Sequence, residues 1–308
     1  VKIPDLVAGD VVRKLTDREE VDPDFVVVRS DGKPVFHLVN VVDDIEMKIS
    51  HVIRGEDHLS NTSKHIELFK AFGVEPPKFA HIPLILNNDG SKMSKRDTGA
   101  SMETYMDGGY LPSAVINYLS LLGWSPKDDT EVMPVAELIE RFDLSGVQRA
   151  NARFDMVKLD WQNYEHIRAM PVEDFKDRAL EQLKSANINT SDFKNSYIEA
   201  AVATCTDKIK NLNDFAAYIG FYFQQEVSFD QDSAEKALTP DNKPYLSALR
   251  EAYAELAQFD ADSLQEALKA TAVSCEVKNK LLVMPARVAC TGSKVGPSLY
   301  HLFEVLGQ

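Results

Sequence analysis

The chain of 308 residues has few cysteines and no long apolar run. Its three cysteines, Cys205, Cys275 and Cys290, are widely spaced and form no C-x-x-C pair. The sequence therefore predicts neither a zinc site nor a disulfide framework. Reduced thiols fit a cytoplasmic protein, which is the expected location. No segment approaches the roughly 18 apolar residues of a membrane span, so we expect no membrane partner.

Basic residues are outnumbered by acidic ones. The 34 Lys+Arg and 48 Asp+Glu give a formal net charge of −14 and a pI of about 5.0. This balance argues against indiscriminate DNA binding. It does not exclude a nucleic-acid partner, because affinity depends on a local basic face. The length and the 44% hydrophobic content indicate a globular protein of about two domains.

The histidines do not fall at a metal-ligand spacing. Four of the five that precede residue 82 lie in the predicted sheet region, at His51, His58, His65 and His81. They match no known zinc-ligand spacing, so we predict no metal site. The sequence starts at Val1, without a methionine, on a strand-like pattern. We therefore expect that a preceding segment is missing.

One basic loop carries the clearest chemical signal. Asp89-Gly90 predicts a turn after the apolar run 82–86. The turn is followed by two lysines three apart, with a hydroxyl between them: Lys92, Met93, Ser94, Lys95 and Arg96. Ammonium, hydroxyl and loop N–H groups suit a polyphosphate. A solvated basic turn is the alternative for an unspecified loop of this composition.

The segment before this loop has the pattern of a parallel sheet. Residues 51–54 predict a buried strand that ends in a charge, and a helix capped by Asn61 or Thr62 follows. Residues 80–86 predict the next strand. Strand, helix and strand without a hairpin form the βαβ unit. Ligands of such sheets lie beyond the carboxyl ends of the strands, so Arg54 and the lysine loop are expected on one rim.

Residues 1 to about 50 predict short strands and turns. A β-branched run over 24–29 is followed by a hairpin-type turn over 30–33. The next apolar run, 35–42, fits a strand or a helix. Phe36 and Asn40 are four residues apart and share one side in either structure. They can therefore line one pocket.

Helical periodicity dominates from residue 101 onward. Pro112 suits the first turn of one helix, and residues 134–142 predict another. Helices are then predicted at 172–186, 192–209, 211–224, 232–238, 243–257, 262–272, 276–291 and 297–306. The predicted fold class is therefore α/β followed by all-α. It comprises a parallel-sheet piece, a small α/β connector and an all-helical C-terminal domain.

Several motifs together resemble one enzyme family. Lys92-Met93-Ser94-Lys95-Arg96 resembles the Lys-Met-Ser-Lys-Ser/Arg signature of class I aminoacyl-tRNA synthetases. Residues 51–62 resemble the bacterial-type glutamyl-tRNA synthetases, and so do 41–44, 109–112 and 121–124, in the expected order. The helical tail is similar to that family's anticodon-binding cage. Glutaminyl-tRNA synthetases fit worse because they end in β-barrels, and truncated tRNA-modifying paralogues lack the helical tail.

The resemblance implies a division of the chain. Residues 1–90 would be the remaining part of a catalytic Rossmann-like domain, with the end of a preceding β-rich insertion. Residues 91–168 would form the ATP-loop and stem-contact domain, and residues 169–308 the helical anticodon-binding domain. Class I synthetases also need an H-x-G-H motif, which is absent from this sequence. We therefore expect the N-terminal half of the catalytic domain to be missing and the chain alone to be inactive.

The resemblance also implies residue roles. Arg54 would pair with the γ-carboxylate of glutamate, because a guanidinium fork distinguishes a carboxylate from an amide. Asn40 would hydrogen-bond in the same pocket, which His58 would line. Phe36 stands where many relatives carry a tyrosine. ATP and Mg²⁺ are the implied cofactors, and the ATP phosphates would lie on Lys92, Met93, Ser94, Lys95 and Arg96, of which Lys92 and Lys95 are the expected catalytic pair.

The implied function is that of a glutamate–tRNA ligase, acting as part of a longer chain. Such an enzyme activates glutamate as its adenylate with ATP and transfers it to the 3′ end of a glutamate-accepting tRNA. The alternative is a catalytically silent tRNA-binding paralogue without the H-x-G-H half-site. The intact lysines and Arg54 favour the ligase, since a silent module has no chemical use for them. No interface is indicated, so a monomer is expected.

Arg54 and a basic group near the end of the chain can also be explained by structure alone, without a functional role. Without the resemblance, Arg54 is best explained as a strand-end ion pair with Glu56 or Asp57. A basic group near the end of the chain suits a solvated face or a contact with the anticodon stem. It consists of Lys278, Lys280, Arg287 and Lys294.

Overall fold

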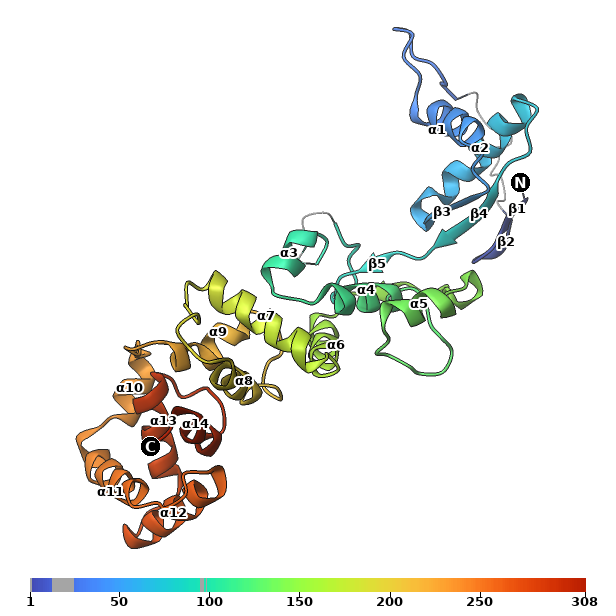
Figure 1. Ribbon diagram of the computed structural model, residues 1–308. Coiled ribbons are helices and arrows are strands. Elements are labelled where there is room, and N and C mark those ends of the chain that lie inside the picture. Colours follow the sequence, from blue (N-terminus) through green and yellow to red (C-terminus); the bar gives the residue numbers. More distant parts are fainter. Residues whose placement is uncertain (1, 13–24, 95–96, 98) are drawn as a thin grey trace. The chain divides into compact units, whose positions relative to one another are not determined.

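The computed structural model describes residues 2–12, 25–94, 97 and 99–308, which fall into two compact units (Figure 1). Unit 1 comprises Val1–Thr104 and Pro112–Leu159, and unit 2 comprises Tyr105–Leu111 and Asp160–Gln308. All strands of the described residues belong to unit 1. Unit 2 is helical, so the predicted order of α/β followed by all-α is confirmed.

A mixed sheet of four strands, in the order β2-β1-β4-β3, forms the base of unit 1. β1 (Lys2–Asp5) and β2 (Gly9–Val12) are an antiparallel hairpin. β4 (Lys78–Ile82) is parallel to β1 on one side and to β3 (His51–Gly55) on the other. Ile3, Ile66 and Phe79 form the small core beneath this sheet.

The predicted βαβ unit is present, because β3 and β4 are parallel and α2 (Leu59–Ala71) connects them. Two details of the prediction are wrong. A 3-10 turn, Glu56–His58, leads directly into α2, so Asn61 and Thr62 lie inside the helix rather than at its cap. β3 was expected to be buried, but Ile53 is 52% exposed.

The predicted strand over residues 80–86 is interrupted. β4 ends at Ile82, and Pro83 follows, which has no N–H group to donate to a neighbouring strand. β5 (Ile85–Leu86) belongs to a second, two-stranded sheet, where it pairs in parallel with β6 (Ala152–Arg153). The lysine loop therefore leaves from this second sheet and not from the main one.

The apolar run over residues 35–42 is helical and forms α1 (Phe36–Glu46). The turn before it is confirmed, since Gly32 adopts φ +82° and donates its N–H to Arg29 O. The strand predicted over 24–29 is wrong for residues 25–29, which form only an isolated bridge between Val28 and Pro34. Residue 24 lies outside the described residues.

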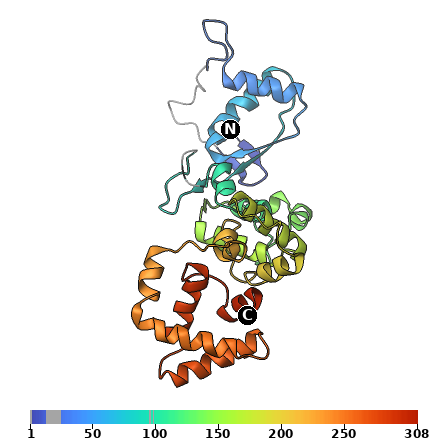
Figure 2. The ribbon, with the colours of Figure 1, turned by 60° about the vertical axis from the view of Figure 1, so that its left-hand side comes forward.

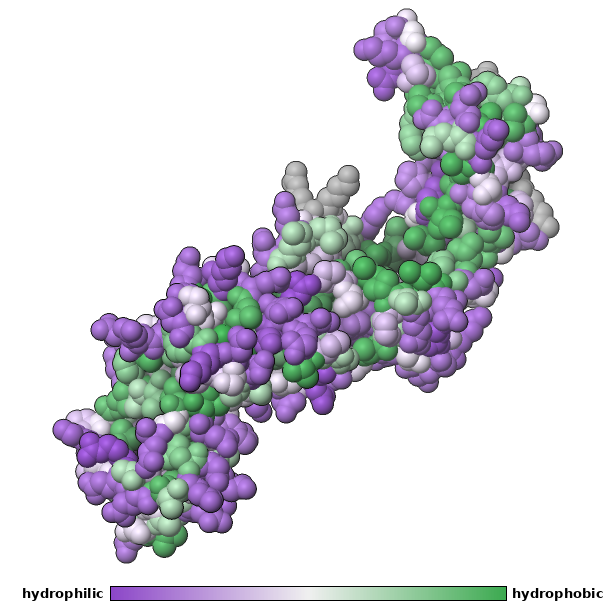
Figure 3. All heavy atoms as spheres, in the orientation of Figure 1, coloured by the Kyte–Doolittle hydropathy of each residue, from purple (hydrophilic) through white to green (hydrophobic). Residues whose placement is uncertain are grey.

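The rest of unit 1 contains α4 (Pro112–Leu121) and α5 (Val135–Arg141), both as predicted. Trp124, Met133 and Leu138 form their shared core. Hydrophobic residues also gather at the surface over α4 and α5 (Figure 3). The division between the units falls inside α3 (Met102–Asp107) and α6 (Met156–Arg168).

Unit 2 confirms the predicted helical array. Its helices are α7 (Val172–Ser185), α8 (Asn195–Ala203), α9 (Asp214–Ile219), α10 (Gln231–Ala237), α11 (Lys243–Ala254), α12 (Ala261–Ser274), α13 (Lys280–Thr291) and α14 (Leu299–Leu306). The carboxylate of Asp260 caps α12 by accepting the N–H of Ser263 at 2.8 Å. The last four helices surround one apolar core that includes Leu264 and Leu268 (Figure 2). No helix in the described part of the chain could cross a membrane.

Truncating the core of α12 should destabilise unit 2. Leu268 is fully buried, so Leu268→Ala should lower the free energy of unfolding by about 2–5 kcal/mol, through lost burial and the cavity left behind. Val273 on the same helix is 79% exposed, and Val273→Ala should change stability by less than about 0.5 kcal/mol. Urea unfolding followed by helical circular dichroism measures both. Equal effects of the two substitutions would contradict this core.

Candidate active site

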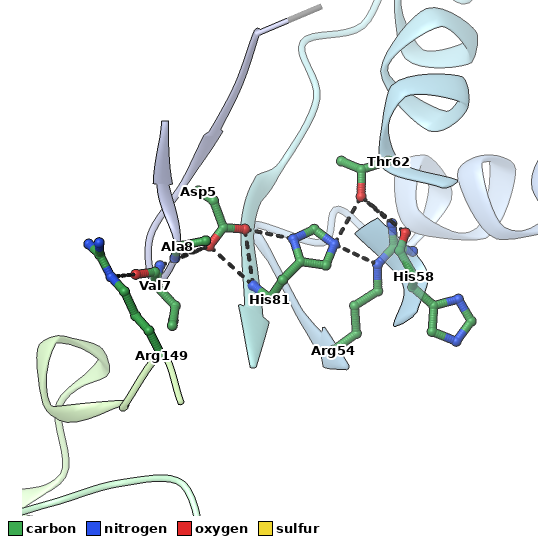
Figure 4. A network of polar contacts seen from close by, with 8 residues as sticks. All are labelled: Asp5, Val7, Ala8, Arg54, His58, Thr62, His81 and Arg149. Carbon is green, nitrogen blue, oxygen red and sulfur yellow. Dashed lines mark hydrogen bonds and ion pairs between the residues drawn. The ribbon is translucent and has the colours of Figure 1, made fainter. Parts of the chain in front are cut away.

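The guanidinium of Arg54 lies at the carboxyl end of β3, where three side chains hold it, and Figure 4 shows two of them, His81 and Thr62. Its Nε donates to His81 Nε2 at 3.3 Å, and its Nη2 donates to Thr62 Oγ1 at 2.8 Å. Its Nη1 lies 3.4 Å from Nδ1 of His65. Burial lowers the pKa of Arg54, while Asp44 opposes this shift. The guanidinium still stays charged, because its ordinary pKa is far above neutral.

Arg54 has no acidic partner within the described part of the chain. Asp57, one of the two carboxylates considered for an ion pair with Arg54, instead accepts a hydrogen bond from Lys92 Nζ at 2.8 Å. A guanidinium group has five N–H groups that can donate hydrogen bonds. Three of them face the protein partners above, so two are left to donate to a ligand.

Behind Arg54, His81 is hydrogen-bonded to the carboxylate of Asp5. Nδ1 of His81 lies 2.6 Å from Asp5 Oδ2, and both side chains are almost fully buried. Burial alone would raise the pKa of Asp5, but hydrogen bonds from Ala8, His81 and Val7 outweigh it and lower that pKa. Asp5 is therefore a charged acceptor. Figure 4 shows this chain of contacts from Asp5 through His81 to Arg54 and Thr62.

A second imidazole contacts Arg54 from α2. His65 is buried, and its Nε2 lies 3.1 Å from Nδ1 of His37 on α1. Burial and the nearby charge of Arg54 lower the pKa of His65 from 6.5 to about 4. His65 is therefore neutral at pH 7, and its Nδ1 presents a lone pair to Arg54.

The other predicted pocket residues gather beside this network. The Phe36 ring lies 6.2 Å from the His58 ring and 5.9 Å from the His65 ring. Asn40 follows Phe36 by one helical turn on α1, so the two side chains share a face. The Oδ1 atom of Asn40 is buried and has no hydrogen-bond partner among the described residues. An unsatisfied buried acceptor of this kind calls for a donor from a ligand or water.

The lysine loop is described only in part. The bond from Asn87 N to Ser91 O, 2.8 Å long, closes its first turn, and Asp97 accepts from Ser94 N at 2.7 Å. Met93 N donates to Ile85 O at 3.1 Å, which holds this side of the loop against β5. Lys95 and Arg96 lie outside the described residues.

Lys92 brings the loop to the edge that Arg54 occupies. Its bond to Asp57 joins the loop to the 3-10 turn directly after β3, three residues beyond Arg54. Lys92 is thus held next to the carboxyl end of β3, although the loop leaves from the second sheet and not from the rim that was expected. The Lys92 bond is also the first cause of the lowered pKa of Asp57.

Sequence reasoning missed the side chains that hold Arg54. Arg54 and His81 occupy paired positions in neighbouring parallel strands, so aligning the two predicted strands could have indicated His81. No sequence pattern indicated that Asp5 would contact His81. It is 76 residues from His81 and reaches that histidine only because β1 pairs with the far side of β4.

Comparison with known proteins identifies the class to which this fold and site belong. Residues 1–161 match the catalytic domain of "tRNA synthetases class I (E and Q)", and residues 170–308 match an "Anticodon binding domain". Class I aminoacyl-tRNA synthetases use ATP as a substrate.

The similar proteins are more specific. The chain is 45% identical over 308 residues to a glutamate–tRNA ligase of Akkermansia muciniphila, covering all of this chain and 69% of that protein. It is 42% identical to the glutamate–tRNA ligase of Methylacidiphilum infernorum, with coverage of 99% and 68%. The chain belongs to the glutamate–tRNA ligase family.

Solved structures agree with this assignment. A glutamate–tRNA ligase from Elizabethkingia meningosepticum, crystallised in complex with its amino acid, superposes with a TM-score of 0.81 at 30% identity. The synthetase of Elizabethkingia anophelis gives a TM-score of 0.77, also at 30% identity. The chain is fully covered in both comparisons but spans 63% of each of those structures.

The depressed pKa of His65 predicts a loss of stability in acid. Its pKa is about 4 in the folded protein, against an ordinary 6.5, so the unfolded state binds more protons between these values. Stability therefore falls as the pH drops through that window, by about 2–3 kcal/mol between pH 7 and pH 4.5. His65→Gln should remove most of this pH dependence. Urea unfolding at the two pH values measures it.

The matched control is His51→Gln, because His51 is an exposed histidine of the same unit. This control should retain the pH dependence of the unaltered protein. An unchanged pH dependence in His65→Gln would contradict the assignment of a buried neutral imidazole.

Proposed function

We propose that this chain provides the glutamate-binding part of a glutamate–tRNA ligase, with Arg54 as the residue that binds the substrate's side-chain carboxylate. One observation carries the proposal. A partly buried guanidinium with two N–H groups to spare has no carboxylate partner among the described residues. A carboxylate fits the remaining donors and supplies the missing negative charge, whereas the amide of glutamine would place two N–H groups nearby.

Three further side chains are proposed to complete the amino-acid pocket. The buried Oδ1 of Asn40 would accept a hydrogen bond from the substrate. Phe36, which is 53% exposed, and His58 would form its wall. Phe36 has no hydroxyl group and so contributes only apolar contact.

ATP is proposed to bind at the lysine loop. The phosphates would contact Lys92, Met93, Ser94, Lys95 and Arg96, as the resemblance implies. The Lys92 side chain pairs with Asp57, and the two side chains are 57% and 42% exposed. An exposed ion pair contributes little, so a phosphate can displace the carboxylate at little cost. Mg²⁺ is proposed to enter with ATP. No group of three or more metal-ligating side chains occurs among the described residues.

The chemistry requires positioning and charge more than covalent participation. The α-carboxylate of glutamate attacks the α-phosphorus of ATP, pyrophosphate leaves, and the tRNA ribose hydroxyl then displaces AMP from the adenylate. Arg54 would orient the glutamate for this attack. Lys92 and Lys95 would stabilise the charge that develops on the departing pyrophosphate.

The Arg54 assignment makes a direct prediction. Arg54→Ala in the whole protein should lower kcat/KM for glutamate by about 10²- to 10³-fold, because a charge-assisted hydrogen bond to the substrate carboxylate is lost. The KM for ATP should change by less than about twofold. ATP–pyrophosphate exchange measures both. Arg141→Ala is the control, since Arg141 is a partly buried arginine of unit 1 whose partners, Asp128 and Glu137, lie outside the site. Undiminished glutamate dependence would refute the proposal.

The tRNA partner is proposed to contact a lysine-rimmed pocket in unit 2. The pocket has a volume of about 460 Å³ and an apolar floor that includes Leu281 and Met284. Four lysines line it, namely Lys236, Lys278, Lys280 and Lys294. Lys236 and Lys294 both pair with Asp232, whereas Lys278 and Lys280 form no ion pair among the described residues. These two are the proposed phosphate contacts.

Arg287 does not belong to this basic group, contrary to the sequence-based expectation. Its guanidinium is partly buried, and Nη1 donates to the carbonyl of Pro297. Burial lowers its pKa. Arg287 therefore stabilises the loop before α14 and is not proposed to contact tRNA.

Charge reversal tests the lysine surface. The double variant Lys278→Glu, Lys280→Glu should weaken tRNA binding. The negative slope of log K against log salt should become shallower by about one to two, since binding releases about one counterion fewer for each phosphate contact that is lost. Lys269→Glu on α12 is a control, because Lys269 is exposed and lies outside the pocket. Filter binding at several salt concentrations provides the measurement. Unchanged affinity and slope would remove this surface from the interface.

We also propose that the protein acts in the cytoplasm as a monomer. The support for the first point is that its three cysteines are unpaired. Sedimentation equilibrium of the whole protein tests the second.

A further inference from the structure

Asp5 and His81 lie behind Arg54 and have no place in the chemistry described so far. The carboxylate of Asp5 accepts from four N–H groups. Its Oδ1 accepts from Val7 N at 2.9 Å and Ala8 N at 2.7 Å, and its Oδ2 accepts from the N–H and the ring Nδ1 of His81 at 3.0 and 2.6 Å. Asp5 is 7% exposed and His81 is 3% exposed. Neither side chain can reach a substrate from this position.

The hydrogen bonds fix the protonation of the His81 ring. A charged carboxylate is only an acceptor, so the proton of the neutral ring must lie on Nδ1. The other nitrogen, Nε2, then carries a lone pair. Two donors point at that lone pair, namely Arg54 Nε at 3.3 Å and the Thr62 hydroxyl at 2.9 Å. With the proton on Nε2 instead, its N–H would face the N–H of Arg54.

Thr62 completes the arrangement. Its Oγ1 accepts from Arg54 Nη2 at 2.8 Å, and its single proton has two acceptors in reach, His81 Nε2 at 2.9 Å and the carbonyl of His58 at 3.4 Å, of which His81 is the nearer. The Nε side of the guanidinium is therefore anchored to an atom whose acceptor state follows from Asp5, and the Nη2 side to a hydroxyl group that contacts the same atom. This sequence of contacts is continuous in Figure 4.

We propose that Asp5 and His81 are a positioning pair that orients the guanidinium of Arg54 and thereby sets the preference of the site for glutamate over glutamine. This inference rests on the proposed role of Arg54. An arginine side chain has many rotamers, and a fork that must meet a carboxylate loses less entropy when it is already held in place. Discrimination between carboxylate and amide depends on that orientation. Asp5 and His81 act only through Arg54.

Two substitutions of His81 separate this role from a general structural one. The carboxamide of Gln reaches the position of Nε2, so His81→Gln keeps an acceptor for Arg54 and loses the contact with Asp5. The shorter carboxamide of Asn reaches only the position of Nδ1, so His81→Asn keeps the contact with Asp5 and loses the acceptor. Steady-state exchange kinetics with glutamate and with glutamine, in the whole protein, compare the two variants.

His81→Asn should raise KM for glutamate and lower the ratio of kcat/KM for glutamate over glutamine by about 10- to 100-fold, the effect of losing one hydrogen bond of a charged group. The KM for ATP should stay within about twofold. His81→Gln should lower the ratio by only about threefold, because it keeps the acceptor for Arg54 but no longer has Asp5 to hold that acceptor in place. Equal ratios in the two variants, or full discrimination in His81→Asn, would overturn the positioning role. The role of Arg54 itself would fail separately, if Arg54→Ala retained the preference for glutamate.

Nitrogen-15 NMR of the unaltered protein tests the same inference without a substitution. The His81 ring should show a protonated Nδ1 and an unprotonated Nε2 at neutral pH. A proton on Nε2, in either the neutral or the doubly protonated ring, would overturn the proposal even if the His81 variants failed to fold.

Discussion

The structure depends on one electrostatic constraint, which is that a charged guanidinium is partly withdrawn from water without an acidic partner among the described residues. Arg54 is held instead by an imidazole on each side and a hydroxyl group. These neutral acceptors satisfy three of its N–H groups but leave its charge uncompensated. Asp44 opposes the resulting pKa shift only as a nearby charge. The site therefore favours a ligand that brings its own negative charge.

This constraint explains why the sheet is built in its particular order. Parallel pairing of β3 and β4 puts His81 directly beside Arg54, and the insertion of β1 on the other side of β4 brings Asp5 to the back of that histidine. α2 supplies Thr62 and His65, while α1 supplies His37. Elements from three separate parts of the sequence thus define one orientation of a single side chain.

The sequence predicted the features that depend on local pattern. Amphipathic periodicity was enough for the helices of unit 2, and the motif around Arg54 was enough for the βαβ unit. It did not predict the end of β4 at Ile82 or the part played by Asp5, because strand pairing over 76 residues follows from the whole sheet. The grouping of Arg287 with the surface lysines was wrong for a similar reason: helical spacing does not show that its guanidinium turns inwards to Pro297.

The most direct test is a crystal structure of the whole protein with glutamate bound. The account predicts that the γ-carboxylate lies within hydrogen-bond distance of the free N–H groups of Arg54, while Nε of Arg54 stays on His81 and Asn40 Oδ1 gains a donor. A glutamate whose γ-carboxylate contacts other residues, with Arg54 still facing only His81, Thr62 and His65, would contradict it.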